Sequence, residues 1–294
     1  MPSNAPRPST TDNPQAASRG LRLIVLAGQH EHVSDPLSTR FAASHRCLVP
    51  LGGRPLIAHV LQTGAHHPRV DSLAVCIERE AFDPVWDVLT QLPGRGSVAL
   101  IEAKPDLAES VLAAAEGWDG PLLITTADHA LLSEETIDAV LEALDHADLA
   151  VALAPRECVE TIDPSPRRHY IRLRDGAFAP CDLYGVADAR FLEAAKVFRG
   201  KSGSRRVAVR IAKAVGLIGL LMIALGLETL PGAIERAARH WRMRIRAVIS
   251  QDGTQAVDVG NDRSYAIVRD ILEQRESAHG TIPVPELLTS RAVG

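Results

Sequence analysis

The first residues of the sequence that suggest chemistry are a glycine and an arginine suited to holding phosphate groups. An apolar run over 21–27 ends at Gly28, and a long polar loop separates Gly28 from Arg46, which precedes a short apolar stretch. Backbone N–H groups at the end of a strand bind anions, and a guanidinium neutralises their charge. This combination predicts a site for a nucleoside triphosphate.

An α/β sheet is expected to position these residues, because apolar runs of strand length alternate with helical patterns. We expect strands at 21–27, 72–77, 98–102, 121–126 and 149–154, and helices at 55–64, 84–92, 106–116 and 133–146. Ser133 is the expected N-cap of the last helix. A hairpin at Asp175–Gly176, a late strand at 244–250, a short strand at 257–259 and a helix at 261–274 complete the pattern. The predicted fold is Rossmann-like, with a mixed, mostly parallel sheet flanked by helices.

The expected organisation is one domain between two tails. Residues 1–20 are rich in Pro, Ser, Thr, Asn and Ala without the apolar segment of a secretory signal, so we expect a flexible tail and a cytoplasmic protein. The domain is expected over 21–275, with a helical insertion at about 187–242 and a C-terminal tail at 276–294. The four cysteines are widely spaced without a C-x-x-C pair, which argues against a zinc site or a disulfide framework.

Positive charge is concentrated near the C-terminal third of a chain whose net charge is −4. Twelve Lys and Arg but only two acidic residues lie between Lys196 and Arg246, which favours contact with an anionic partner. The apolar run 214–227 within this segment is shorter than the about 20 residues needed to span a bilayer. Segment 205–227 is therefore expected to be a buried helix, a homodimer contact or a helix on an anionic membrane surface. Few aromatic residues and an acidic remainder argue against nucleic acid as a partner.

Three short motifs, in their order and spacing, resemble those of the MobA-like nucleotidyltransferases. They are LAG at 26–28 leading to R-x-L-x-x-x-x-G-x-P-L at 46–56, the apolar strand and Asp128 within 121–132, and A-V-D-V-G-N-D at 256–262. The resemblance spans roughly residues 21–272 and implies a GT-A-like fold with Mg²⁺ as the cofactor.

The resemblance also implies roles for individual residues. Arg46 and Asp128 would be catalytic, and Asp128 and Asp258 would hold the metal. The expected nucleotide- or substrate-binding residues are Ala27, Gly28, Gln29, Arg40, Arg54, Glu109 and Ser110. Taken in isolation, the two aspartates also suit turns or helix caps, and Gln29, Arg54, Glu109 and Ser110 also suit a solvated surface.

The chain departs from the family pattern in its phosphate loop. No glycine follows Gly28 in the loop up to Arg40, so side chains such as Arg40 and Arg46 would hold more of the phosphate charge. Arg46 replaces the usual lysine, which exchanges a point charge for a planar fork. His30 and His32 are interpreted as solvated, because no other metal ligand lies near them in the sequence.

The predicted function is transfer of a nucleoside monophosphate from a nucleoside triphosphate to a phosphorylated small molecule, with release of pyrophosphate. CTP is slightly favoured over GTP if the apolar segment indicates activation of a lipid headgroup. One alternative is a GT-A glycosyltransferase with a membrane acceptor, although His129–Ala130 does not complete a D-x-D motif after Asp128. The other is a nucleotide-binding regulator without catalysis.

Overall fold

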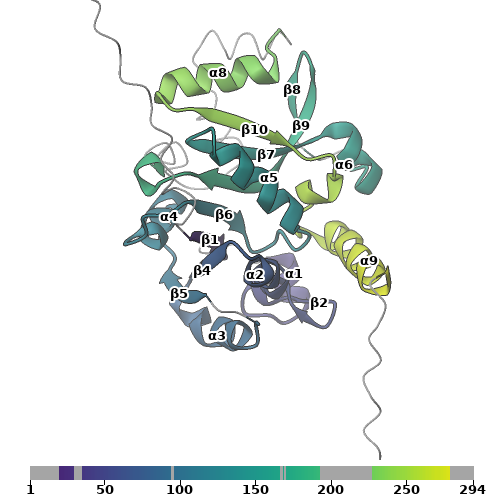
Figure 1. Cartoon of the computed structure of the whole chain (residues 1–294). Coiled ribbons are helices and arrows are strands. Elements are labelled where there is room, and N and C mark those ends of the chain that lie inside the picture. The colour runs from purple at the N-terminus through teal and green to yellow at the C-terminus, as the bar shows by residue number, and fades with distance from the viewer. Residues whose placement is uncertain are drawn as a thin grey trace, which may run out of the picture.

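The computed structural model describes residues 20–29, 35–93, 96–165, 168, 170–192 and 227–278. Figure 1 shows one main sheet with helices packed on both of its faces. His30 and His32 lie outside the described residues. Residues 1–19 and 279–294 also lie outside them. Of the segment 205–227, only Leu227 is described.

The main sheet has eight strands in the order β10-β7-β9-β6-β1-β4-β5, with β8 paired to β9. Its strands are β1 Leu21–Leu26, β4 Val70–Ile77, β5 Ser97–Glu102, β6 Leu122–Thr126, β7 Leu149–Pro155, β8 Ile171–Leu173, β9 Gly176–Val186 and β10 Ile245–Ile249. β5, β4, β1 and β6 are parallel neighbours, whereas β9 is antiparallel to both β6 and β7. β2 Pro50–Leu51 and β3 Arg54–Pro55 form a separate two-stranded hairpin.

Alternate residues of the central strand β1 pack against helices on opposite faces of the sheet. Leu23 and Val25 join the core formed with α2, α3 and α5, whereas Ile24 joins the core formed with α4. The helices are α1 Pro36–Arg40, α2 Leu56–His66, α3 Phe82–Thr90, α4 Leu107–Ala115, α5 Glu134–Leu144, α6 Arg156–Ile162, α8 Leu230–Trp241 and α9 Asp262–Ala278, with 3-10 turns η2 Arg46–Leu48, η3 Arg79–Ala81 and η5 Gly253–Ala256. Burial on both faces explains why β1 is almost uniformly apolar.

The mostly parallel α/β sheet predicted from the sequence is confirmed, with most element ends shifted by one or two residues. The Ser133 hydroxyl accepts a hydrogen bond from the backbone N–H of Thr136, so the predicted N-cap is confirmed. The hairpin at Asp175–Gly176 joins β8 to β9 and is also confirmed. The predicted strand at 257–259 is wrong, because these residues leave η5 as an extended segment that pairs with no strand of the sheet.

The structure describes only part of the predicted helical insertion and only the start of the predicted C-terminal tail. The helical insertion expected at 187–242 is described over 187–192 and 227–242, where it contains α8. α9 continues through Ala278, past the expected domain end at 275. In the described ranges, no helix combines the length and the hydropathy needed to span a bilayer.

An ion pair between Asp148 and Arg244 fastens the edge strand β10 to β7. Arg244 donates from Nε and Nη2 to Asp148 Oδ1 at 3.2 and 2.7 Å, and its backbone N–H donates to Oδ2 at 2.8 Å. Asp148 is buried at the amino end of β7. The hydrogen bonds from Arg244 hold the pKa of Asp148 below its usual value, outweighing burial, which raises it.

We expect Asp148→Asn to lower the free energy of unfolding at pH 7 by about 1–2 kcal/mol, because the charge-assisted bonds weaken. A carboxylate with a lowered folded-state pKa stabilises the fold above its unfolded pKa of about 3.9 and loses this contribution as the pH falls through the folded value. The difference from the native chain should therefore shrink towards pH 3. Urea denaturation of both proteins between pH 3 and 7 measures it, and a difference independent of pH would contradict this account.

Candidate active site

The phosphate-binding residues predicted after β1 and the metal-binding aspartate predicted after β6 lie close together. They do so because the carboxyl ends of these two strands are adjacent. The backbone N–H of Ala27 donates to Cys76 O at 2.9 Å, and that of Ala127 donates to Leu26 O at 3.0 Å. The parallel ladder therefore continues beyond the strand ends, and Gly28 and Asp128 emerge on adjacent strands. Open α/β sheets bind their ligands at this edge.

A pocket of about 370 Å³ opens at this edge. Its lining combines backbone from the end of β1, the start of α1, and charged side chains from three separate segments. The lining residues are Leu26, Ala27, Gly28, Gln29, Asp35, Pro36, Arg46, Cys47, Leu56, Leu107, Thr126, Ala127 and Asp128. Five of the sequence-predicted site residues, Ala27, Gly28, Gln29, Arg46 and Asp128, thus line one pocket.

Gly28 occupies a place where a side chain does not fit. A Cβ added to Gly28 would lie 2.9 Å from Ala103 Cβ and 3.3 Å from Glu78 Oε1. Real Cβ atoms do not approach another carbon so closely, so the end of β1 would have to move. The glycine is required by close contact with the loop after β5, in addition to any approach of phosphate.

We expect Gly28→Ala to weaken nucleotide binding and to cost about 1–3 kcal/mol in the free energy of unfolding, as overpacking does. The displaced backbone would no longer present the N–H group of Gly28 to the pocket in the same place. Calorimetric titration with a nucleoside triphosphate and urea denaturation measure the two effects. Unchanged affinity and stability would contradict the contact with Ala103.

Arg46 is held at the mouth of the pocket by Asp35. Nε and Nη2 of Arg46 donate to Asp35 Oδ1 at 3.1 and 2.7 Å, and Nη1 lies 3.6 Å from Asp128 Oδ2. Asp35 is also the N-cap of α1, where its Oδ2 accepts from the backbone N–H and hydroxyl of Ser38. Burial raises the pKa of Asp35, but the bonds from Arg46 and Ser38 outweigh it and hold the pKa low.

Asp258 faces the same region because its two neighbours are anchored in a separate core. Val257 and Val259 are fully buried with α1, α9 and the residues after β6, so the intervening Asp258 side chain points away from that core. The backbone N–H of Val259 donates to Asp128 O at 3.0 Å. This hydrogen bond ties the segment after η5 directly to the end of β6.

A third carboxylate, that of Asp182 on β9, acts together with those of Asp128 and Asp258, although no sequence motif points to it. Burial raises the pKa of Asp182 to about 7, and the charges of Asp258 and Asp128 add to the rise. Burial raises the pKa of Asp128 too, and Asp258 adds to it, whereas Thr126 and Arg46 oppose it. The negative charges of the three aspartates therefore oppose one another, which favours a cation nearby.

The backbone at Asp182 explains how a strand residue reaches this cluster. Its φ is 47°, which is rare outside glycine, and the register of β9 against β7 shifts between Val151 and Leu153. Such a bulge redirects a side chain and is frequent beside functional sites. The only sequence signal was a single acidic residue inside the otherwise weakly polar run 181–186.

The donor chemistry of these carboxylates fits Mg²⁺. Within the described ranges, no group of three or more His, Cys, Asp and Glu side chains is close enough to enclose a metal ion. Mg²⁺ does not need such a cage, because it is usually held by one or two carboxylates together with waters and substrate phosphates. Burial and the charges of neighbouring aspartates raise the pKa values of Asp128 and Asp182, and a bound cation would oppose both rises.

Arg168 supplies a second cation beside the carboxylates. Its guanidinium lies 3.8 Å from Asp258 and 3.7 Å from Asp163, and it donates to Ala256 O. Its side chain is largely buried. Cationic groups thus lie beside both proposed metal ligands, Arg46 beside Asp128 and Arg168 beside Asp258.

Gln29 closes the pocket on the β4 side. Its backbone N–H donates to Glu78 Oε1 at 2.5 Å, and His45 Nε2 lies 3.8 Å from Glu78 Oε2. Gln29 Nε2 and Glu78 Oε2 are buried without a hydrogen-bond partner in the described part of the chain. Buried polar groups of this kind usually find partners in water or a ligand.

The other predicted site residues do not line the pocket formed by the described chain. Arg40 donates to Asp262 at 2.6 Å, and Arg54 donates to Gln62 and to Glu276, so both arginines are directed to polar side chains outside the pocket. Ser110 is buried, and its hydroxyl accepts from the backbone N–H of Lys104 at 2.8 Å, which fixes the loop after β5. The adjacent Glu109 is exposed on α4.

Cys47 lines the pocket but is not suited to nucleophilic chemistry. Burial raises the pKa of its thiol to about 12, and the charge of Glu78 adds to the effect. The thiol is therefore protonated at neutral pH. All four cysteines are free, in agreement with the prediction from their spacing.

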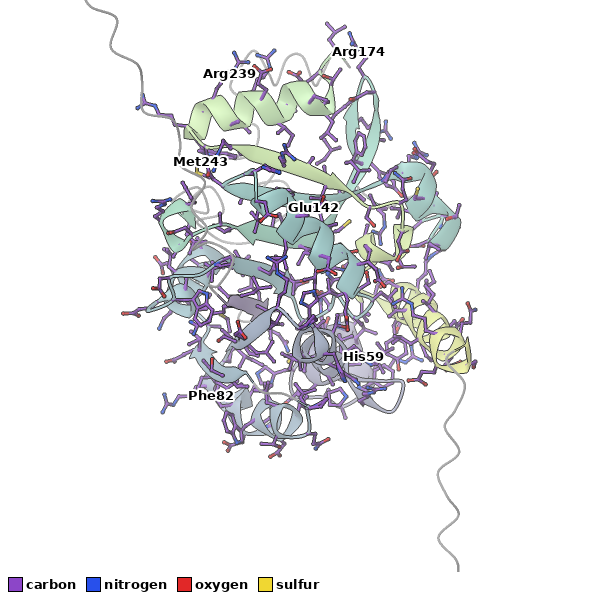
Figure 2. The ribbon with its side chains drawn as sticks, in the orientation of Figure 1. His59, Phe82, Glu142, Arg174, Arg239 and Met243 are labelled. Carbon is purple, nitrogen blue, oxygen red and sulfur yellow. The ribbon has the colours of Figure 1, made fainter. Side chains whose placement is uncertain are left out.

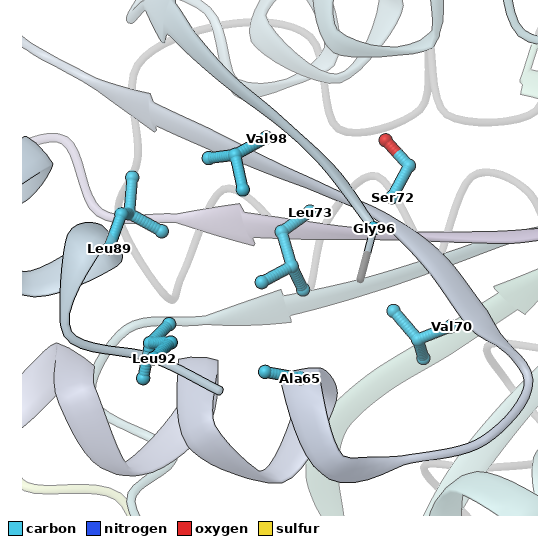
Figure 3. Close-up of a pocket in the computed structure, with 8 residues that line it drawn as sticks. All are labelled: Ala65, Val70, Ser72, Leu73, Leu89, Leu92, Gly96 and Val98. Atoms are coloured by element: carbon cyan, nitrogen blue, oxygen red, sulfur yellow. The ribbon is translucent and has the colours of Figure 1, made fainter. Parts of the chain in front are cut away.

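A second cavity, of about 70 Å³, lies at the opposite, amino ends of β4 and β5 (Figure 3). Its lining is almost wholly apolar, with Val70, Leu73, Leu89, Leu92 and Val98 among its residues. It is too small for a nucleotide, and the described residues that line it carry no charge. We interpret it as a packing defect beneath α3.

The described part of the basic segment is placed away from α2. Figure 2 shows Arg239, which belongs to the basic segment 196–246, on α8 at the end of the molecule, far from His59 on α2. Arg236 pairs with the buried Glu228 at 2.6 Å. Part of the positive charge noted in the sequence therefore stabilises the fold.

Comparison with known proteins agrees with this arrangement. The family model described as "MobA-like NTP transferase domain" matches residues 23–214. A hypothetical transferase from Thermus thermophilus is 25% identical, with a TM-score of 0.64 over 84% of this chain and 99% of its own. No curated protein matches the sequence.

Two further solved structures share the fold at 11% identity. One is 4-diphosphocytidyl-2C-methyl-D-erythritol synthase from Anaerococcus prevotii, with a TM-score of 0.54 over 89% of this chain and 99% of its own. The other is CMP:2-keto-3-deoxy-manno-octonic acid synthetase complexed with CTP, with a TM-score of 0.53 over 87% and 100%.

Proposed function

Because this chain belongs to the MobA-like NTP transferase family, we propose that it transfers a nucleoside monophosphate from a nucleoside triphosphate to a phosphorylated small molecule and releases pyrophosphate. Mg²⁺ is the proposed cofactor. The observation that carries the proposal is the pocket that joins the backbone of Ala27–Gln29, the guanidinium of Arg46 and the carboxylate of Asp128.

These groups suit the charge of the reaction. An acceptor phosphate oxygen attacks the α-phosphorus, the bond from that phosphorus to the β-phosphate oxygen breaks, and pyrophosphate leaves with the electron pair. The backbone N–H of Gly28 would bind a phosphate oxygen, and Arg46 would neutralise charge on the triphosphate. Asp128 and Asp258 would hold Mg²⁺, which supplies further positive charge at the phosphates.

The acceptor is proposed to enter on the side of Asp258 and Arg168. Arg168 lies beside the carboxylates and does not line the pocket, so its positive charge would attract an anionic acceptor to that side. The anionic membrane surface and the homodimer contact through 205–227 stay predictions, because the structure does not describe that segment apart from Leu227.

CTP is the nucleotide that we would test first. One solved structure of the same fold is complexed with CTP, which supports a pyrimidine triphosphate as the donor. The unpartnered atoms Gln29 Nε2 and Glu78 Oε2 supply one donor and one acceptor near the pocket. A nucleobase edge with one acceptor and one donor would satisfy both atoms.

The test is pyrophosphate release with Mg²⁺ and each of the four ribonucleoside triphosphates, in the presence of a pool of phosphorylated metabolites. Release with one nucleotide, with a new product heavier than its acceptor by the nucleotidyl group, would support the proposal. Release of a nucleoside diphosphate from a nucleotide-sugar would favour the glycosyltransferase instead. Nucleotide binding without any product would favour the non-catalytic regulator.

A further inference from the structure

We propose that Asp35 is a positioning residue that keeps Arg46 from closing onto Asp128, so that Arg46 remains available to the triphosphate. This inference rests on the proposed function, because it assigns a task to the two charged side chains of the same pocket. Asp35 was not selected from the sequence, since it lies 11 residues before Arg46 in a polar loop.

Four hydrogen bonds immobilise the Asp35 carboxylate. Oδ1 accepts from Nε and Nη2 of Arg46, and Oδ2 accepts from the backbone N–H and the hydroxyl of Ser38 at 2.9 and 2.8 Å. The side chain of Asp35 is only 5% exposed. A carboxylate bound on both oxygens at a helix N-terminus is a fixed point from which the guanidinium is oriented.

The third nitrogen of the Arg46 guanidinium lies near Asp128, and this is the ion pair that Asp35 limits. Nη1 lies 3.6 Å from Asp128 Oδ2, which is an ion-pair distance but longer than a hydrogen bond. Asp35 has the largest effect of any carboxylate on the pKa of Arg46, and Asp128 and Asp258 follow it. If the charge of Asp35 is removed, the two that remain are the proposed metal ligands.

Arg46 would then pair more closely with Asp128, and this pairing has two consequences. The guanidinium would be less available to the phosphates, and it would compete with Mg²⁺ for the same carboxylate. Loss of Asp35 should therefore weaken triphosphate binding most at low Mg²⁺. Saturating Mg²⁺ should displace Arg46 from Asp128 and restore much of the binding.

A second aspartate–arginine pair, Asp148 with Arg244, serves as a matched control for the structural effect of removing the carboxylate charge. Arg244 donates to a single oxygen of Asp148 from Nε at 3.2 Å and from Nη2 at 2.7 Å, nearly the geometry of Arg46 on Asp35. Both aspartates are buried, and both accept a backbone N–H on the other oxygen. Asp148 lies at the amino end of β7, on the edge of the sheet opposite to the pocket.

The experiment is calorimetric titration of the full chain with inorganic tripolyphosphate, a probe without a base, at low and at saturating Mg²⁺. We expect D35N to bind about tenfold more weakly than the native chain at low Mg²⁺, as for residues that orient another ligand. The deficit should shrink at saturating Mg²⁺. D148N should bind as the native chain does in both conditions.

A second variant separates the charge of Asp35 from its role as the N-cap of α1. D35S keeps an oxygen that can cap α1 but removes the charged clamp on Arg46, so it should show the same dependence on Mg²⁺. Binding by D35N and D35S equal to that of the native chain would overturn the inference. A deficit that is the same at both Mg²⁺ concentrations would also overturn it, because a merely structural role predicts that result. No binding by the native chain would overturn the proposed triphosphate site itself.

Discussion

Asp128→Ala is expected to reduce pyrophosphate release by about 10³-fold or more. Metal-assisted charge stabilisation contributes several kcal/mol to such reactions, and each tenfold change in rate corresponds to about 1.4 kcal/mol. Asp128 lies at the carboxyl end of β6, beside Arg46 and Asp258, where it would hold Mg²⁺. Steady-state assays with the preferred nucleotide measure the loss of kcat.

The control is Asp128→Asn, which keeps the size and the backbone geometry and removes only the charge. It should lose nearly as much activity as the alanine variant and bind Mg²⁺ more weakly. Because the native Asp128 repels Asp258 and Asp182, the neutral variant should be at least as stable in urea as the native chain. Retention of native turnover by either variant would show that the metal site is assigned wrongly.

Arg46→Ala is expected to lower kcat/KM for the nucleotide by about 10²-fold, as the loss of one charged donor to a developing anion does. Arg46→Lys should recover only part of this loss. Lysine restores a point charge but cannot donate two hydrogen bonds to Asp35 while a third nitrogen faces Asp128. Both variants are compared by kcat and KM measured with the nucleotide varied.

Arg54→Ala is the matched control for Arg46. The sequence predicted Arg54 as a nucleotide-binding residue, but its guanidinium is directed to Gln62 and to Glu276 on α9. Kinetic constants within about twofold of the native values are expected, because ion pairs at an exposed position contribute little. A loss as large as that of Arg46→Ala would mean that Arg54 turns towards the phosphates when nucleotide binds.

The strands and most of the helices were predictable because their signals are local. β1 and β6 are apolar runs buried on both faces, and Ser133 carries its own capping hydroxyl. The motif residues Gly28 and Asp128 follow directly from the ends of those strands. For these residues, a short stretch of sequence determines both the element and the position at its end.

The parts that were not predicted depend on contacts between distant segments. Asp182 reaches the site through a bulge in β9, which is visible only once β9 is inserted between β6 and β7. Asp258 is oriented by the burial of both its neighbours under α9, not by a strand of the sheet. Arg40 lies within a motif region, but its actual partner, Asp262, is 222 residues away in the sequence.

The central claim is that a nucleoside triphosphate and a divalent cation bind at the carboxyl ends of β1 and β6. The most direct measurement is a crystal structure with the preferred nucleotide and Mn²⁺, which replaces Mg²⁺ and is located by its anomalous scattering. The account predicts a manganese peak at coordinating distance from an Asp128 oxygen, with Arg46 on the triphosphate. A nucleotide bound elsewhere, or a metal ion held without Asp128, would contradict it.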